Sequence, residues 1–128
     1  MIKHYKLEDF TQDSFLHGTI EKISYDAQNK YFQVVFSYLN FTSGGCLYDC
    51  TITITDWWSI TTSFTRGDEA LDINGLTDLI SKNPIDCAIY ENIIDNNDVT
   101  LNGHVGDCLF SFKFTKPKIQ ITGEYDPD

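Results

Sequence analysis

Positively charged residues are scarce in this sequence. Its 128 residues include nine lysines and arginines against nineteen aspartates and glutamates, which gives a formal net charge of −10. Nucleic-acid binding draws most of its affinity from basic side chains that neutralise phosphates, and anionic membrane surfaces attract basic segments in the same way. The charge balance therefore argues against nucleic acids and membranes as partners. It favours a basic protein partner, which the negative charge would attract at long range.

Long apolar runs are also missing. No stretch approaches the roughly 20 apolar residues of a spanning helix. The first residues, MIKHYKLEDFTQD, lack the apolar segment of a signal peptide. We therefore expect a cytoplasmic location, in which cysteines stay reduced. A chain of this length with 41% hydrophobic residues suits a single domain over residues 1–128 that packs a core without disulfides or metals.

Catalytic and metal-binding motifs are absent as well. His4, His17 and His104 share no ligand spacing such as HxH or HExxH, and no GxSxG signature is present. The cysteines lack the tight pairs of a zinc site, and we expect them to pack as small apolar groups. They are Cys46, Cys50, Cys87 and Cys108. We predict no catalytic residue, no cofactor and no metal.

Alternating apolar and polar residues predict a protein built mainly of β-strands. In the segment LYDCTITIT, Tyr48, Cys50, Ile52 and Ile54 would face inward. The links between apolar segments are short, which favours an antiparallel sheet over a parallel one. We predict about seven strands, in a sheet that is curled or sandwich-like. The extended segments are 18–25, 31–39, 47–55, 58–65, 85–94, 98–105, 108–114 and 118–123.

One helix is predicted at residues 74–82, where Asn74 would cap the N-terminus and Leu76, Leu79 and Ile80 would form an apolar stripe. Residues 8–16 are expected to form a short helical turn, and a β-bulge is expected near Glu21 or Lys22. The predicted fold class is therefore α+β, mainly β: an antiparallel sheet with one helix packed on it.

The dipeptide Trp57-Trp58 is the most informative pair of residues. Neighbouring residues on a strand point to opposite faces, so one ring can enter the core while the other meets solvent or is covered by a second layer, a helix or a loop. An exposed tryptophan is a good contact anchor, since tryptophan is enriched among binding hot spots. Our candidate partner-binding residues are Trp58 with the acidic residues Asp56, Asp68 and Glu69.

Three segments resemble a group of small bacterial proteins that includes immunity proteins of polymorphic toxin systems. Residues 14–25 resemble a Leu-His-Asp motif that opens a strand, although Gly18 stands where the acid is expected. Residues 50–60 resemble a strand that ends in Asp-Trp-Lys-Ser, with Trp58 in place of the basic residue. Residues 99–114 resemble a glycine-containing strand followed by a hairpin into an aromatic strand. The resemblance implies a protein that neutralises a toxin by binding it.

The leading hypothesis is a non-enzymatic protein-binding domain, in the form of an immunity protein that neutralises a basic toxin. One alternative is a small, hydrolase-like enzyme whose site is assembled from distant residues, with His17 or His104 beside a carboxylate. Another alternative is a homo-oligomeric assembly module that uses sheet-edge pairing.

Overall fold

The computed structural model of the chain describes residues 2–6, 15–41, 45–83, 85–95 and 98–126. Within these residues, ten strands form one antiparallel sheet in the order β1-β10-β4-β3-β2-β7-β8-β9-β5-β6. Their bounds are β1 (Ile2–Lys6), β2 (Phe15–Asp26), β3 (Tyr31–Phe41), β4 (Cys46–Thr55), β5 (Ser59–Arg66), β6 (Glu69–Ala70), β7 (Cys87–Asp95), β8 (Asp98–Val105), β9 (Cys108–Thr115) and β10 (Lys118–Asp126). The mainly β, antiparallel architecture is confirmed, whereas the predicted number of about seven strands is too low.

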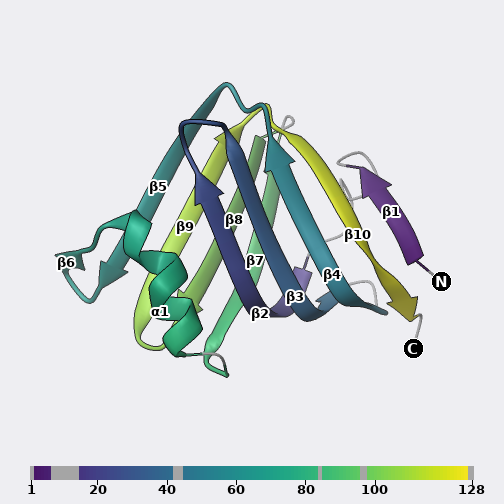
Figure 1. Cartoon of the computed structure of the whole chain (residues 1–128), viewed down its shortest axis with the longest axis horizontal. Helices are drawn as coiled ribbons and strands as arrows, with labels where there is room; N and C mark the ends of the chain where they lie inside the picture. The colour runs from purple at the N-terminus through teal and green to yellow at the C-terminus, as the bar shows by residue number, and fades with distance from the viewer. Residues whose placement is uncertain (1, 7–14, 42–44, 84, 96–97, 127–128) are drawn as a thin grey trace.

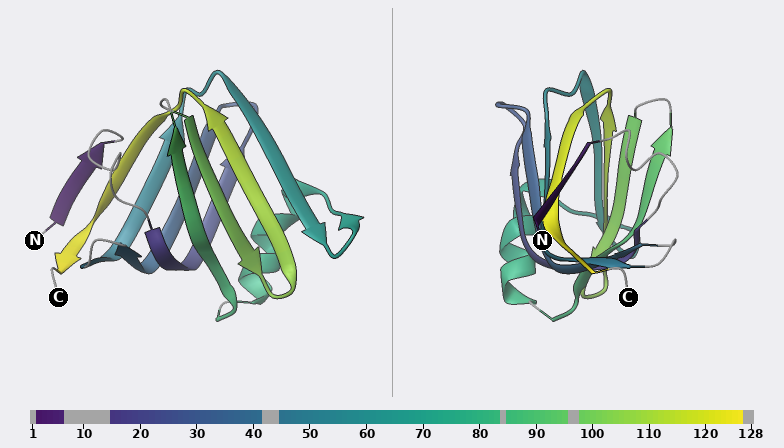
Figure 2. Two further views of the ribbon diagram at one scale, coloured as in Figure 1. Left: turned by 180° about the vertical axis from the view of Figure 1, so that it is seen from behind. Right: turned by 90° about the vertical axis from the view of Figure 1, so that its right-hand side faces the viewer.

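The sheet folds over on itself into two layers (Figures 1 and 2). One layer contains β1, β10, β4, β3 and β2, and the other contains β7, β8, β9 and β5 with the short β6. The layers meet where β2 pairs with β7, and this pairing involves only Gly18 with Ile89 and Thr19 with Ala88. So short a ladder lets the two strands diverge, and the space between the layers holds the core.

Gly18 lies at this junction because no side chain fits there. A Cβ atom at this position would come within 2.5 Å of Leu39 Cδ1 and 2.8 Å of Phe36 Cδ1. Gly18 pairs with Leu39 of β3 and with Ile89 of β7, so three strands converge on it. A larger side chain after His17 would therefore overlap the core.

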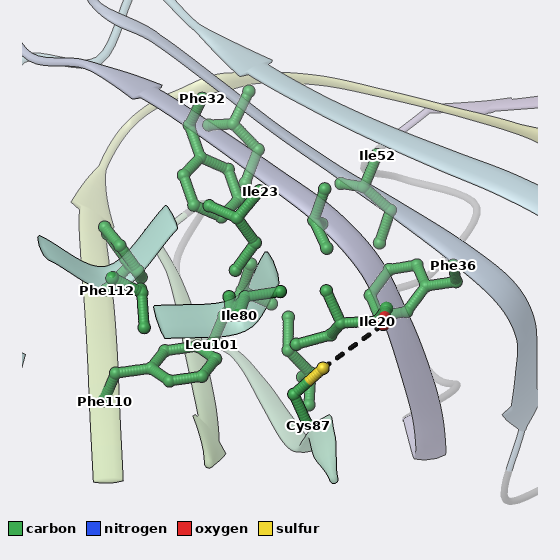
Figure 3. Close-up of a cluster of buried hydrophobic side chains, with 14 of the residues drawn as sticks. Ile20, Ile23, Phe32, Phe36, Ile52, Ile80, Cys87, Leu101, Phe110 and Phe112 are labelled. Carbon is green, nitrogen blue, oxygen red and sulfur yellow. Dashed lines mark hydrogen bonds between the residues drawn. The ribbon is translucent and has the colours of Figure 1, made fainter. Parts of the chain in front are cut away.

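Aromatic rings from both layers meet in the core. The ring centroids of Phe32 on β3 and Phe112 on β9 are 4.7 Å apart, and those of Trp57 and Phe114 are 5.0 Å apart. Figure 3 shows Phe32 and Phe112 reaching toward each other across the space between the layers. Full burial of such side chains stabilises the fold by roughly 1.5–3 kcal/mol each.

The helix α1 (Leu76–Lys82) packs beside β2, with Leu76 and Ile80 buried. The hydroxyl of Thr77 donates to the carbonyl of Ile23, with 3.1 Å between the oxygens. The predicted cap is wrong: Asn74 belongs to a 3₁₀ turn, and its N–H donates to the Asp72 carboxylate at 2.9 Å. No helix among the described residues has the length and hydrophobicity to cross a bilayer.

Two local predictions for β2 have different outcomes. The register of β2 against β3 shifts between Ile20 and Lys22, which confirms the predicted bulge. The predicted helical turn at 8–16 is wrong at its end, because residues 15–16 belong to β2. Residues 8–14 lie outside the described part of the chain.

The alternation predicted for β4 breaks at Asp49. This residue has a φ of +49°, a left-handed conformation that is rare for residues other than glycine. Leu47 and Cys50 are buried on either side of it, whereas Tyr48 is 46% exposed. The prediction that Tyr48 faces inward is therefore wrong, because the backbone turns over between Leu47 and Cys50.

Candidate functional site

The two tryptophans separate as the dipeptide predicts. Trp57 is buried against Phe114, with 2% of its surface exposed, whereas Trp58 is 71% exposed. Asp56 makes this possible, because its φ of +54° turns the chain between β4 and β5. The N–H of Trp58 donates to the carbonyl of Thr115 at 2.8 Å, which holds the residue beside the β9–β10 turn.

Lysines surround the exposed tryptophan. The ammonium of Lys116 lies 4.2 Å from the centroid of the Trp58 ring, a cation–π contact. The ammonium of Lys118 lies 3.4 Å from the Asp56 carboxylate. We call Asp56, Trp58, Lys116 and Lys118 the Trp58 corner. Its formal charge is +1, because the two lysines outweigh the Asp56 carboxylate.

Asp68 and Glu69 do not join the Trp58 corner. They lie in the hairpin between β5 and β6, at the opposite end of β5 from Trp58. An eight-residue strand spans about 25 Å, so these carboxylates are far from the tryptophan. The length of β5 therefore separates the four candidate residues into two pairs, Asp56 with Trp58 at one end and Asp68 with Glu69 at the other.

A second exposed cluster lies on the outer face of the β7–β8–β9 layer. The rings of Tyr90 and His104 are stacked with their centroids 6.5 Å apart. His104 pairs across the ladder with Leu109, which is 53% exposed. The register between β7 and β8 shifts between Ile89 and Glu91, and the Tyr90 side chain at this irregularity is exposed. We call Tyr90, His104 and Leu109 the β7–β9 patch.

Carboxylates border this patch. The Asp86 carboxylate lies 4.0 Å from Nδ1 of His104. Asp107 lies in the turn just before Leu109 and pairs with Arg66 at 3.5 Å. The Glu91 carboxylate accepts a hydrogen bond from the Asn102 amide at 2.8 Å. An apolar centre with an acidic border is suited to a basic surface that presents its own apolar residue.

Sequence analysis missed the β7–β9 patch. It assigned His104 to no binding surface, and it gave Tyr90 and Leu109 no role. Each of the three residues lies on a different strand, so only the strand order brings them together. The exposed position of Leu109 does follow from alternation, because Cys108 and Phe110 on either side are buried.

The cysteines lie in the core. All four are free thiols and buried. Burial raises the pKa of the Cys50 thiol to about 12, and that of Cys87 is raised for the same reason. Cys87 donates to the carbonyl of Ile20 at 3.3 Å, as Figure 3 shows. A thiol with a raised pKa is a poor nucleophile near neutral pH because little thiolate forms.

The histidines do not converge on one site in the described part of the chain. His17 lies on β2 opposite Asn40, His4 lies on β1 opposite Thr122, and His104 lies on β8. Among the described residues, no group of three or more histidines, cysteines or acids is arranged to hold a metal ion.

Comparison of the chain with protein-family models, curated proteins and solved structures finds no match.

Proposed function

We propose that this chain is a non-enzymatic protein-binding domain whose partner is a basic protein, in the manner of an immunity protein that neutralises a toxin. The observation that carries the proposal is the β7–β9 patch with its acidic border. Tyr90 and Leu109 offer apolar surface, and the carboxylates of Asp86 and Glu91 border it beside the ion pair of Asp107 and Arg66.

The charge distribution moves the contact surface away from the position expected from sequence. A basic partner would meet two lysines at the Trp58 corner. At the end of the molecule with the β5–β6 and β8–β9 turns, it would meet Asp68, Glu69 and Asp107, which together outweigh the single positive charge of Arg66. The net charge of −10 attracts a basic protein from a distance, and this local asymmetry orients it toward the acidic end.

The test begins with the immobilised chain and a lysate of cells that naturally express it. A basic protein should be captured, and its association rate should fall as salt rises from about 0.05 to 0.5 M, because salt screens exposed charges. Leu109→Lys should then weaken binding of that protein at least about tenfold, since it removes apolar contact and places a cation against a basic surface.

Gln120→Lys is the matched control, because it makes the same change of side-chain charge on an exposed position of β10, in the other layer. The affinity of Gln120→Lys for the captured protein should stay within about twofold of that of the unmodified chain, because this variant lowers the net negative charge without changing the β7–β9 patch. Equal binding by the original chain and Leu109→Lys would reject the β7–β9 patch. Capture of acidic proteins only, with no effect of salt, would reject the proposal as a whole.

A further inference from the structure

The first five residues of β5 form an open sheet edge. On one side, β9 pairs with the whole of β5, from Ser59 with Thr115 to Arg66 with Cys108. On the other side, β6 pairs only with Thr65 and Arg66. Within the described residues, the stretch Ser59–Ser63 therefore has no strand on its second side. Figure 1 shows β5 at the margin of its layer, with β6 at one end only.

The direction of the free backbone groups follows from one hydrogen bond. The N–H of Leu71 donates to the carbonyl of Phe64 at 2.7 Å, so the Phe64 carbonyl points away from β9. In an antiparallel strand, the N–H and C=O of one residue point to the same side, and this side alternates along the strand. Ile60 and Thr62 therefore direct their N–H and C=O groups toward the open edge.

This edge lacks the features that usually prevent strand pairing. The sequence SITTS contains no charge and no proline, and its register against β9 is regular. The edge at the other end of the sheet differs, because β1 contains Lys3 and Lys6 within five residues. Lysines on an edge strand discourage pairing with another chain. The open edge of β5 is the one suited to pairing.

We propose that this edge pairs with β5 of a second copy of the chain, antiparallel and about a two-fold axis at Thr61. In this register Ile60 lies opposite Thr62 of the second copy, and each such pair exchanges two backbone hydrogen bonds. Thr61 lies opposite its own equivalent, and Ser59 lies opposite Ser63. The segment is therefore complementary to itself, as a two-fold interface requires.

Local charges set the orientation of the second copy, although the net charge of −10 on each copy opposes association at long range. Antiparallel pairing places the Trp58 corner of one copy next to Leu71 and the β5–β6 hairpin of the other, because Ser59 is the last residue that can pair, opposite Ser63. Lys116 and Lys118 then approach Asp68 and Glu69 across the interface, and the exposed Trp58 ring gains a neighbouring surface. Asp56 and Trp58 of one copy are thereby brought near Asp68 and Glu69 of the other, although the two pairs lie apart in one chain.

The same geometry limits assembly to two copies. Leu71 and β6 occupy the edge of β5 from Phe64 onward, so a paired strand cannot extend past this point. One second copy saturates the free N–H and C=O groups of Ile60 and Thr62. The product is a closed dimer in which two sheets join through their β5 strands.

Sedimentation equilibrium of the full chain at micromolar concentration tests the proposal. A dimer is expected. Thr61→Lys and Thr61→Glu should each raise the dimer dissociation constant about tenfold or more, since like charges would face each other at the axis. An equimolar mixture of the two variants should restore a dimer.

Gln120→Lys and Gln120→Glu are the controls, and they should dimerise as the original chain does. Thr61→Cys gives a second readout, because residues opposite each other in a non-hydrogen-bonded pair have Cα atoms about 4.5 Å apart, within disulfide range. Mild oxidation should link two copies through this residue, since the four native thiols are buried. A monomeric original chain, an undisturbed Thr61→Lys dimer or an unlinked Thr61→Cys protein would each overturn the proposal.

Discussion

Substitution of Gly103 by alanine should destabilise this protein more than a single methyl group usually does. Gly103 lies in the middle of β8, and a Cβ atom there would come within 2.3 Å of Phe110 Cζ and 2.6 Å of the Ala88 carbonyl oxygen. The Phe110 ring could shift, but Ala88 pairs with His104 in the β7–β8 ladder and cannot move alone. Relief of the contact with the Ala88 carbonyl oxygen requires β7 and β8 to separate.

The expected loss is about 3 kcal/mol, the upper end of the range for overpacking a well-packed core. For a chain of this size, such a loss lowers the unfolding temperature by about 10 °C. Urea titrations followed by circular dichroism would measure it from the shift in midpoint. Phe110→Leu should reduce the penalty of Gly103→Ala without removing it, because the carbonyl contact remains.

Gly75→Ala is the matched control for this prediction. No atom lies within 4 Å of its Cβ position and its φ is −83°, so the change should be neutral or stabilising by up to about 0.5 kcal/mol. If Gly103→Ala unfolds at the same urea concentration as Gly75→Ala, the close approach of β7, β8 and Phe110 is wrong.

Two further predictions concern the segments that connect β4 with β5 and β2 with β3. Trp57→Ala should lower the free energy of unfolding by about 3–5 kcal/mol, because it leaves a cavity in the core beside Phe114. Trp58→Ala should change the free energy of unfolding by less than about 1 kcal/mol, because this ring is exposed. Similar urea midpoints for the two variants would contradict this. Hydrogen bonds from the side chain and the backbone N–H of Asn29 hold the pKa of Asp26 below its usual value. The stabilisation they provide is present above the unfolded pKa and is lost as the pH falls through the folded pKa. Asn29→Ala should therefore raise the pKa of Asp26 in an NMR titration, and an unchanged titration midpoint would show that the hydrogen bonds are not made.

Sequence alternation predicted strands well where the backbone is regular. The bounds predicted for 98–105 agree with β8, and those for 108–114 differ from β9 by one residue. Alternation failed at Tyr48, because the positive φ of Asp49 has no signature in the sequence. The prediction also omitted β1 and β6. β1 carries lysines, and β6 has only two residues, so neither produces an apolar pattern.

The candidate site was harder to predict because it depends on strand order. The dipeptide indicated that one of Trp57 and Trp58 can be exposed without showing which, and the distance of Trp58 from Asp68 depends on how long β5 runs without a turn. The β7–β9 patch depends on three strands lying side by side. Pairwise alternation identifies which residues point outward, whereas their grouping is a property of the folded sheet.

The position of β10 has a consequence for synthesis of the chain. β10 inserts between β1 and β4, so two of the earlier strands are joined by the last of the ten strands in the sheet. While the nascent chain emerges from the ribosome, β3 can pair with β4. Until β10 is made, the backbone hydrogen-bonding groups on the other edge of β4 and those of β1 lack the strand with which they pair in the folded sheet. A stalled or shortened translation product that ends before Lys118 would therefore expose the unpaired edge of β4 and should be prone to aggregation and to binding by chaperones.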